Sequence, residues 1–520
     1  MKISNILLSA ALVFNYAKAR VINTENSNDV IENNNKESNN VIENKNFKNE
    51  YHCINDVNGI CDAILGEINV ALNDLSSTFE FKQQVVFESY IFNATDIMPQ
   101  YSNLVALATD INFVSLKSSN DLNTPPYIYT QALAKQLNIN REINLKKNDF
   151  VIIFNTDIID KLLTFVPNYN LSTTILHEII HVLNNFNAIP PSAASSEDEI
   201  KKYFAESSFM PSTVLSIDSN VIDNATSIMD LLNIKQEITS FYPLSIYQKY
   251  LIDLNTNEKI FKDLGFLHEI FNKCIESYGN VELKDISAII TNCVNKFDTE
   301  TKNSIRNVAV NYYIKPESMG FLSNDNSILG VQTFDGKFIT SSSVFHSDYK
   351  YFNEMDKKRI NGNLPPEYGN ITEENAREKL DENFLMYFDT IMLSRESLLK
   401  TVAKDNKHGL IGPNIVSALK TMGWTEKGEK SSDDLYYVDS DNYPEQCETK
   451  LNFKVYSLFT EMNSMQGPIV EPPVDIPSVE PPVETQSVDP NDSDSNNEDD
   501  IPDLNTVEVE EEIDSDEDSN

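Results

Sequence analysis

Residues 171–187 read LSTTILHEIIHVLNNFN, and this stretch decides the fold that we expect. Ser172 and Thr173 suit a helix start, and the apolar residues behind them recur at helical spacing, so the sequence predicts a buried helix. These apolar residues are Ile175, Leu176, Ile179, Ile180 and Leu183. His177 and His181 are four residues apart and therefore lie on one face of that helix.

Glu178 follows His177 directly, which gives the pattern His-Glu-x-x-His that is typical of zinc peptidases. Two imidazoles one helical turn apart can bind one zinc ion, and the carboxylate beside them can activate a zinc-bound water. The chain has only 6 histidines in 520 residues, so on the order of one such chain in two hundred would contain the pattern by chance. The alternative is a buried helix with two incidental histidines, but burying these polar groups without a partner is costly.

The first 19 residues have the features of a secretory signal peptide. Lys2 precedes an apolar run over residues 6–14, and Ala17 and Ala19 form a small-residue cleavage pattern. The sequence has no run near the roughly 18 apolar residues that a transmembrane helix needs. We therefore expect a secreted, extracellular protein. Asn-x-Ser/Thr triplets, which can carry glycans on that route, begin at Asn93, Asn170, Asn224, Asn370 and Asn491.

Acidic residues are concentrated at the C-terminus. The net charge is -39, and residues 466–520 contain 19 Asp or Glu but no Lys or Arg. This proline-rich segment cannot bury enough apolar surface to fold, so we expect a disordered acidic tail. An acidic chain of this kind is a poor candidate for binding nucleic acid.

The chain has 5 cysteines, and in an oxidising compartment an odd number leaves one without a partner in the same chain. Cys274 and Cys293 flank a short predicted helical hairpin and are plausible partners. We expect Cys61 to pair with Cys447, which leaves Cys53 as the spare thiol.

Several separated blocks of the chain share features with a known family. They are the signal peptide, CIND at 53–56, HEIIH at 177–181, LMYFDTIM at 385–392, IGP at 411–413 and LKTMGW at 419–424. Together these blocks resemble the leishmanolysin-like zinc metalloproteases and related metzincin-type enzymes. The resemblance implies that Cys53 is a pro-segment thiol that caps the zinc and that Met392 lies on a turn beneath the metal. An ordinary structural cysteine and a core methionine are the alternatives.

The third metal ligand must lie far along the chain. Asn184 stands where metzincins have a glycine, and Asn187 stands where their short-spaced motif has a ligand. By the resemblance, the distant ligand lies about a dozen residues before Met392, where Asp381 can bind zinc through oxygen. We therefore assign Asp381 as the third ligand. The alternatives are His346, Glu199 or Glu206 on the next predicted helix, and loss of the ligand.

Sequence and resemblance together predict an α+β, zincin-type fold with a mixed sheet backing the metal-binding helix. The continuous apolar run at 150–154 fits a strand buried on both faces. Pro413 and Gly423 mark the expected start and end of a helix near the C-terminus. The expected segments are a signal peptide (1–19), a low-complexity linker or pro-segment (20–50), an N-terminal zincin subdomain with the metal helix (51–190), a helical insertion (191–329), a small closing subdomain with the Met-turn (330–428), a C-terminal extension (429–465) and the acidic tail (466–520).

We thus expect a secreted zinc metalloendopeptidase that hydrolyses protein or peptide substrates. In this prediction His177, His181 and Asp381 hold Zn²⁺, and Glu178 acts as general base. Two alternatives stay open. One is a catalytically inactive zincin-fold protein that binds partners or surfaces, and the other is an unrelated exported scaffold in which the motif is incidental.

Overall fold

The structure is a computed structural model, and it describes residues 40–53, 59–93, 105–121, 123–166, 169–184, 213–216, 237–279, 281–282, 286–336, 344, 346–348, 371–387 and 393–441. The statements below concern these residues. Several sequence predictions fall outside them: the signal peptide, the acidic tail, Met392, Cys447, Glu199 and Glu206.

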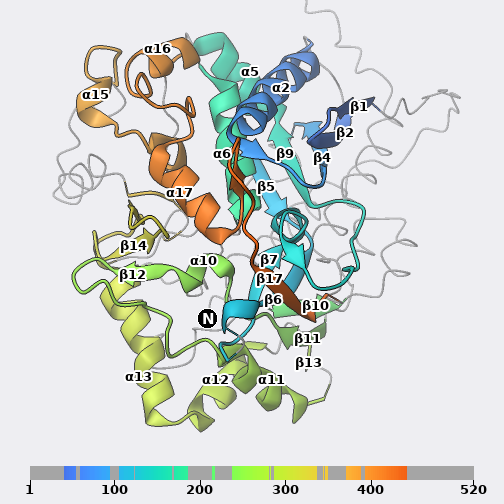
Figure 1. Cartoon of the computed structure of the whole chain (residues 1–520), viewed down its shortest axis with the longest axis vertical. Helices are drawn as coiled ribbons and strands as arrows, with labels where there is room; N and C mark the ends of the chain where they lie inside the picture. The colour runs from blue at the N-terminus through green and yellow to red at the C-terminus, as the bar shows by residue number, and fades with distance from the viewer. Residues whose placement is uncertain are drawn as a thin grey trace, which may run out of the picture. The chain divides into compact units, whose positions relative to one another are not determined.

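A five-stranded mixed sheet underlies the metal helix, with the strand order β1-β2-β4-β9-β5 (Figure 1). The strands are β1 (Asn40–Glu43), β2 (Phe47–Cys53), β4 (Val85–Phe92), β9 (Phe150–Asn155) and β5 (Ala106–Asp110). β2, β4 and β9 run parallel, whereas β1 and β5 pair antiparallel at the two edges. The apolar run at 150–154 is β9, in which Phe150, Ile152 and Phe154 are fully buried. The mixed sheet and the α+β class are as predicted.

Two long helices pack together beside this sheet, α2 (Ile60–Thr78) and α6 (Leu171–Asn184). α6 is the predicted metal helix, and its five apolar residues from Ile175 to Leu183 are all fully buried. Its start differs in one detail from the prediction, because Asn170 Oδ1 accepts a hydrogen bond from the Thr173 N–H at 3.3 Å. Burial of the apolar face fixes the direction in which the two histidines point.

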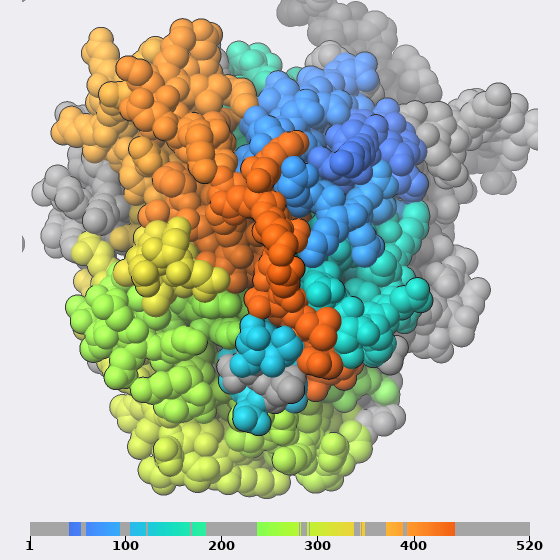
Figure 2. Space-filling view, in the orientation of Figure 1, coloured from blue at the N-terminus to red at the C-terminus, as the bar shows by residue number. Residues whose placement is uncertain are grey.

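Four smaller sheets complete the β structure of the described residues. Their strands are β3 (Phe79–Glu80), β6 (Phe113–Ser118), β7 (Tyr127–Thr130), β8 (Asn138–Ile139), β10 (Thr213–Ser216), β11 (Glu237–Phe241), β12 (Leu251–Asp253), β13 (Val281–Glu282), β14 (Met319–Leu322), β15 (Ile328–Gly330), β16 (Thr425–Glu426) and β17 (Leu435–Ser440). Figure 2 shows the orange segment that carries β16 and β17 running along the surface, where these strands pair with β3 and β6. From the hairpin β14–β15 the chain continues toward His346.

The remaining helices are mostly short. They are α4 (Gln131–Ala134), α5 (Thr156–Phe165), α10 (Ile246–Lys249), α11 (Leu267–Glu276), α12 (Ile286–Lys296), α13 (Thr299–Val308), α15 (Ala376–Lys379), α16 (Arg395–Lys400) and α17 (Pro413–Met422), with single turns η3 (Ser119–Asp121), η5 (Ala309–Tyr313) and η6 (Phe384–Met386). α17 begins at Pro413 and ends before Gly423, as these two residues predict, and Gly423 has a φ of 129°. No helix in the described ranges is long and apolar enough to cross a membrane.

Two disulfides join cysteines of the described chain. Cys274 on α11 is bonded to Cys293 on α12, as predicted. The other prediction was wrong, because Cys53 is bonded to Cys61 rather than being the spare thiol. Cys53 ends β2 and Cys61 lies in the first turn of α2, so their Cα atoms come within 6.3 Å. A cysteine held in this bond is not available to cap a metal ion, and the latch role implied by the resemblance does not apply to this state.

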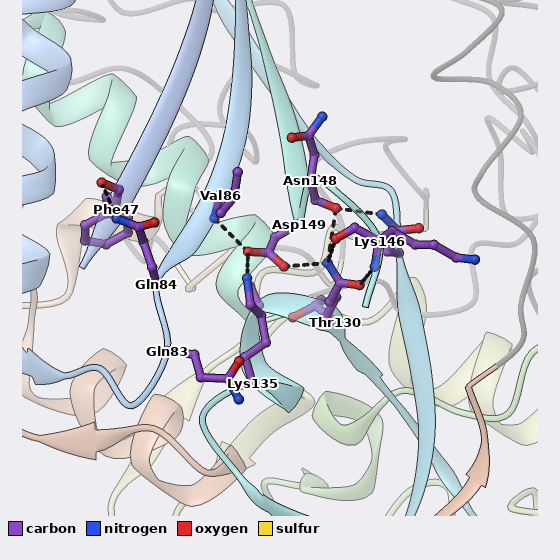
Figure 3. Close-up of polar contacts among 12 residues, drawn as sticks. Phe47, Gln83, Gln84, Val86, Thr130, Lys135, Lys146, Asn148 and Asp149 are labelled. Carbon is purple, nitrogen blue, oxygen red and sulfur yellow. Dashed lines mark hydrogen bonds and ion pairs between the residues drawn. The ribbon is translucent and has the colours of Figure 1, made fainter. Parts of the chain in front are cut away.

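A buried ion pair fastens the start of β9 to its neighbours (Figure 3). Asp149 is fully buried, and its Oδ2 accepts from Lys135 Nζ at 2.7 Å and from the Val86 N–H at 2.8 Å. Its Oδ1 accepts from Gln131 Nε2 at 2.7 Å. Burial raises the pKa of Asp149, and Lys135 opposes that rise. These contacts connect β4 and α4 to the residue that precedes β9.

Replacing Lys135 by Met should therefore leave a buried carboxylate without its cation. We expect Lys135→Met to lower the free energy of unfolding by about 3–5 kcal/mol, measured by urea denaturation. The double variant Lys135→Met/Asp149→Asn should recover part of this loss, because the neutral amide needs no counter-ion. A single variant as stable as the wild type would contradict this account of the pair.

Candidate metal centre

Three histidines from two distant parts of the chain meet in the described structure. His177 and His181 project from α6, and His346 approaches them from the segment that follows β15. Their Nε2 atoms form a triangle with sides of 3.0 Å (His177 to His181), 3.2 Å (His177 to His346) and 3.2 Å (His181 to His346). This group, hereafter the histidine triad, could hold a metal ion.

The size of the triangle fits coordination of one ion. In a tetrahedral site with zinc–nitrogen bonds of about 2.0–2.1 Å, the ligand nitrogens lie about 3.3–3.4 Å apart. The observed sides of 3.0–3.2 Å are slightly shorter than this. The three Nε2 atoms therefore lie close enough together for one cation to bind all of them. Imidazole ligands suit zinc, copper, iron and nickel.

The two helix histidines are held in the neutral form that binds metal. Burial lowers the pKa of His177 to about 4, against a small opposing effect of its bond to Leu385. Burial also lowers the pKa of His181 well below its usual range, and the neighbouring imidazoles lower it further. A neutral imidazole has one nitrogen lone pair available to a metal.

Hydrogen bonding selects which nitrogen of His177 faces the triad. Its Nδ1 lies 2.6 Å from the carbonyl oxygen of Leu385, so Nδ1 carries the proton and donates to this oxygen. Nε2 is then left as the metal-binding atom. A ligand histidine usually donates its other ring N–H to a carbonyl or carboxylate in this way.

The turn η6 also supports His346. The Met386 carbonyl, next to that of Leu385, accepts from the Ser347 N–H at 2.8 Å. Met386 itself is fully buried. The resemblance placed the supporting methionine at Met392, which lies outside the described residues. The turn that contacts the histidine-bearing segments is the one at Phe384–Met386.

His346 reaches the triad through an irregular strand pairing. Val331 and Ser347 form an antiparallel bridge, which continues the course of β15. Beyond it, Gln332 donates its N–H to the His346 carbonyl at 2.8 Å and accepts from the Val344 N–H at 2.8 Å. Val344 has a φ of 67°, which is strained for a β-branched residue. Bulged pairings of this kind redirect a side chain, and here the redirected residue is a triad histidine.

Asp381, the ligand assigned from the sequence, has a different position. It is exposed, and its Oδ1 accepts from the Asn383 N–H at 2.6 Å, just before η6. The triad contains His346 instead, which was the second choice. The sequence offered one signal for His346, since it is among only 6 histidines, but the count back from Met392 pointed to a different stretch of the chain.

Glu178 is held beside the edge of the main sheet. Its Oε2 accepts from the Ala108 N–H of β5 at 3.0 Å. Burial raises the pKa of Glu178 to about 7, and the bond from Ala108 opposes this rise. Val105 accepts from Asn155 of the neighbouring strand, so alternation turns the N–H of Ala108 away from β9 and toward α6. Glu178 thus has a fixed direction through a backbone donor.

His346 and Asp381 as third ligand predict opposite effects of two substitutions on zinc binding. We expect His346→Ala to lower the zinc affinity of the purified chain by at least about tenfold, since one of three ligands is lost. Asp381→Ala should leave one zinc per chain, measured by elemental analysis after dialysis. Loss of zinc in Asp381→Ala with retention in His346→Ala would return the assignment to Asp381.

Comparison with known proteins supplies no relative from which a function can be transferred. The chain matches no protein-family model, no curated protein and no solved structure. The chemistry of the residues around the histidine triad is therefore the basis for inferring what the site does.

Proposed function

We propose that this protein is a secreted, zinc-dependent endopeptidase. The observation that carries the proposal is the meeting of His346 with His177 and His181, at 3.0–3.2 Å between Nε2 atoms, on the helix that bears Glu178. Catalytic zinc typically has three protein ligands and a fourth position for water. Two disulfides in the described chain fit an oxidising compartment.

Zinc is the proposed metal for this donor set. The triad offers three imidazole nitrogens and no thiolate, which is one of the ligand sets used by catalytic zinc. When bound, zinc supplies a Lewis acid that lowers the pKa of its water and polarises a carbonyl group. His177 keeps its ligand nitrogen turned inward because Nδ1 donates to Leu385.

Glu178 is the proposed general base. It takes a proton from the attacking water and passes it to the nitrogen of the leaving amine, so no covalent intermediate with the protein forms. The Ala108 N–H holds the carboxylate in one direction before substrate binds. This orientation removes part of the entropic barrier to proton transfer.

Peptides are the proposed substrates because an edge strand lies next to the base. β5 is the last strand of the five-stranded sheet and packs against α6. An extended peptide can add to such an edge by main-chain hydrogen bonds. His346 supplies a third nitrogen beside His177 and His181, which supports the peptidase over the catalytically inactive alternative.

The role of Glu178 is tested by a substitution that keeps its shape. We expect Glu178→Gln to lower kcat/KM for an extended peptide by about 10²–10⁴-fold while one zinc per chain is retained, because only the proton acceptor is lost. Glu269→Gln, at the other His-Glu pair of the chain, is the matched control and should keep full activity. Undiminished hydrolysis by Glu178→Gln would remove this residue from the mechanism.

The Ala108 N–H can be deleted without changing a side chain near the base. Ala108→Pro removes the donor, and an edge strand tolerates proline where the N–H faces away from its neighbour. A hydrogen bond to a charged group contributes about 1.5–3 kcal/mol, so kcat should fall about tenfold or more. Ala106→Pro is the matched comparison, because it also removes an N–H from the side of β5 proposed to bind peptide but leaves the donor to Glu178 in place. Equal kcat values for the two proline variants would contradict an orienting role for Ala108.

A further inference from the structure

We propose that Asn383 is a positioning residue for the metal centre, because it caps α17 from outside the helix and fixes the turn that holds two triad histidines. This inference rests on the proposed metal site. It concerns a residue that does not contact the triad itself and acts only through η6.

The start of α17 lacks a cap of its own. Gly412 occupies the N-cap position and has no side chain to accept from the helix N–H groups. Asn383 supplies the missing acceptor, and its Oδ1 accepts from the Asn414 N–H at 3.0 Å. A Cβ atom at Gly412 would overlap the Glu382 carbonyl oxygen and Asn383. Glycine at this position therefore lets the segment before η6 lie directly on the helix end.

Asn383 leads directly into the residues that hold the histidines. Its N–H donates to Asp381 Oδ1 at 2.6 Å, and its carbonyl accepts from Ser347 Oγ at 3.2 Å. Two residues later the Leu385 carbonyl accepts from His177, and the next carbonyl accepts from the Ser347 N–H. A shift of Asn383 would move the acceptors of both segments together.

The other side of α17 supports the strand that leads to His346. Ser417 Oγ donates to Asp325 Oδ2 at 2.7 Å, and Thr421 Oγ1 accepts from the Asn324 N–H at 2.8 Å. Asn414 Nδ2 donates to the Ile328 carbonyl at 3.0 Å. These contacts anchor the hairpin β14–β15, whose continuation pairs with Val344 and with residues 346–348.

One further contact brings α6 into the same arrangement. Trp424, just after α17, donates its indole N–H to the Leu183 carbonyl at 3.1 Å. Leu183 lies two positions after His181 on the metal helix. Residues 412–424 therefore contact all three supports of the triad: α6, η6 and the hairpin before His346. Asn383, directly before η6, makes the contact between η6 and the start of α17.

The test uses the full secreted chain and compares Asn383→Ala with a matched loss of a cap elsewhere. Ser394 caps α16 through a 3.1 Å bond from the Ser397 N–H, so Ser394→Ala removes an equivalent bond near the same region. Zinc affinity is measured by competition with a chelator, and the visible spectrum of the cobalt-loaded protein reports ligand geometry. Both variants should lose a similar, small amount of thermal stability, because each loses one helix cap.

We expect Asn383→Ala to weaken zinc binding about 10–100-fold and to change the cobalt spectrum, while Ser394→Ala changes neither. Asn383→Asp keeps the acceptor oxygen and should restore both readouts. Should Asn383→Ala not fold, Asn383→Ser serves in its place, because its hydroxyl is too short to reach Asn414. Zinc affinity and spectrum equal to those of Ser394→Ala would overturn the proposal.

The two proposals fail in different ways. A wild-type chain that binds zinc, responds to Asn383→Ala as expected and cleaves no peptide would overturn the peptidase function and leave the positioning role intact. An active wild type whose zinc affinity is insensitive to Asn383 would do the reverse. A wild type that binds neither zinc nor cobalt would overturn both.

Discussion

Three imidazole nitrogens held within 3.2 Å of one another are the constraint on which the rest of this structure depends. Burial lowers the pKa of both helix histidines, which favours the neutral form that can bind a metal ion. The packed face of α6, the bulged pairing at Gln332 and the turn η6 all oppose the separation of these rings. Each of them fixes a backbone position, and the side chains then have little freedom left.

Local patterns in the sequence were enough to predict the parts of the site that lie on one element. The spacing of Ile175 to Leu183 gave α6 its buried face, and with it the shared face of His177 and His181. The run at 150–154 became β9 because five consecutive apolar residues suit a strand covered on both sides. The pair Cys274–Cys293 was likewise predictable, since both cysteines belong to one helical hairpin.

The sequence was not sufficient to predict contacts between segments that are far apart along the chain. His346 joins the triad because Gln332, just after β15, bonds to both Val344 and His346, and no periodicity in the sequence signals such an irregular pairing. Asp381 lies close to η6 in sequence and accepts from the Asn383 N–H, but it is not among the residues that the fold brings together in the triad. Cys53 pairs with Cys61 because the end of β2 lies beside the start of α2, which only the folded sheet determines.

Because of the position of His346, an ion bound by the triad would cross-link two segments that are far apart in sequence. His346 and His181 are separated by 165 residues, so an ion that joins them closes a very long loop. Closing such a loop reduces the entropy of the unfolded chain, as a disulfide over the same span would. In the proposed metal centre, metal loading and global stability would therefore be linked, and a chelator would lower the free energy of unfolding.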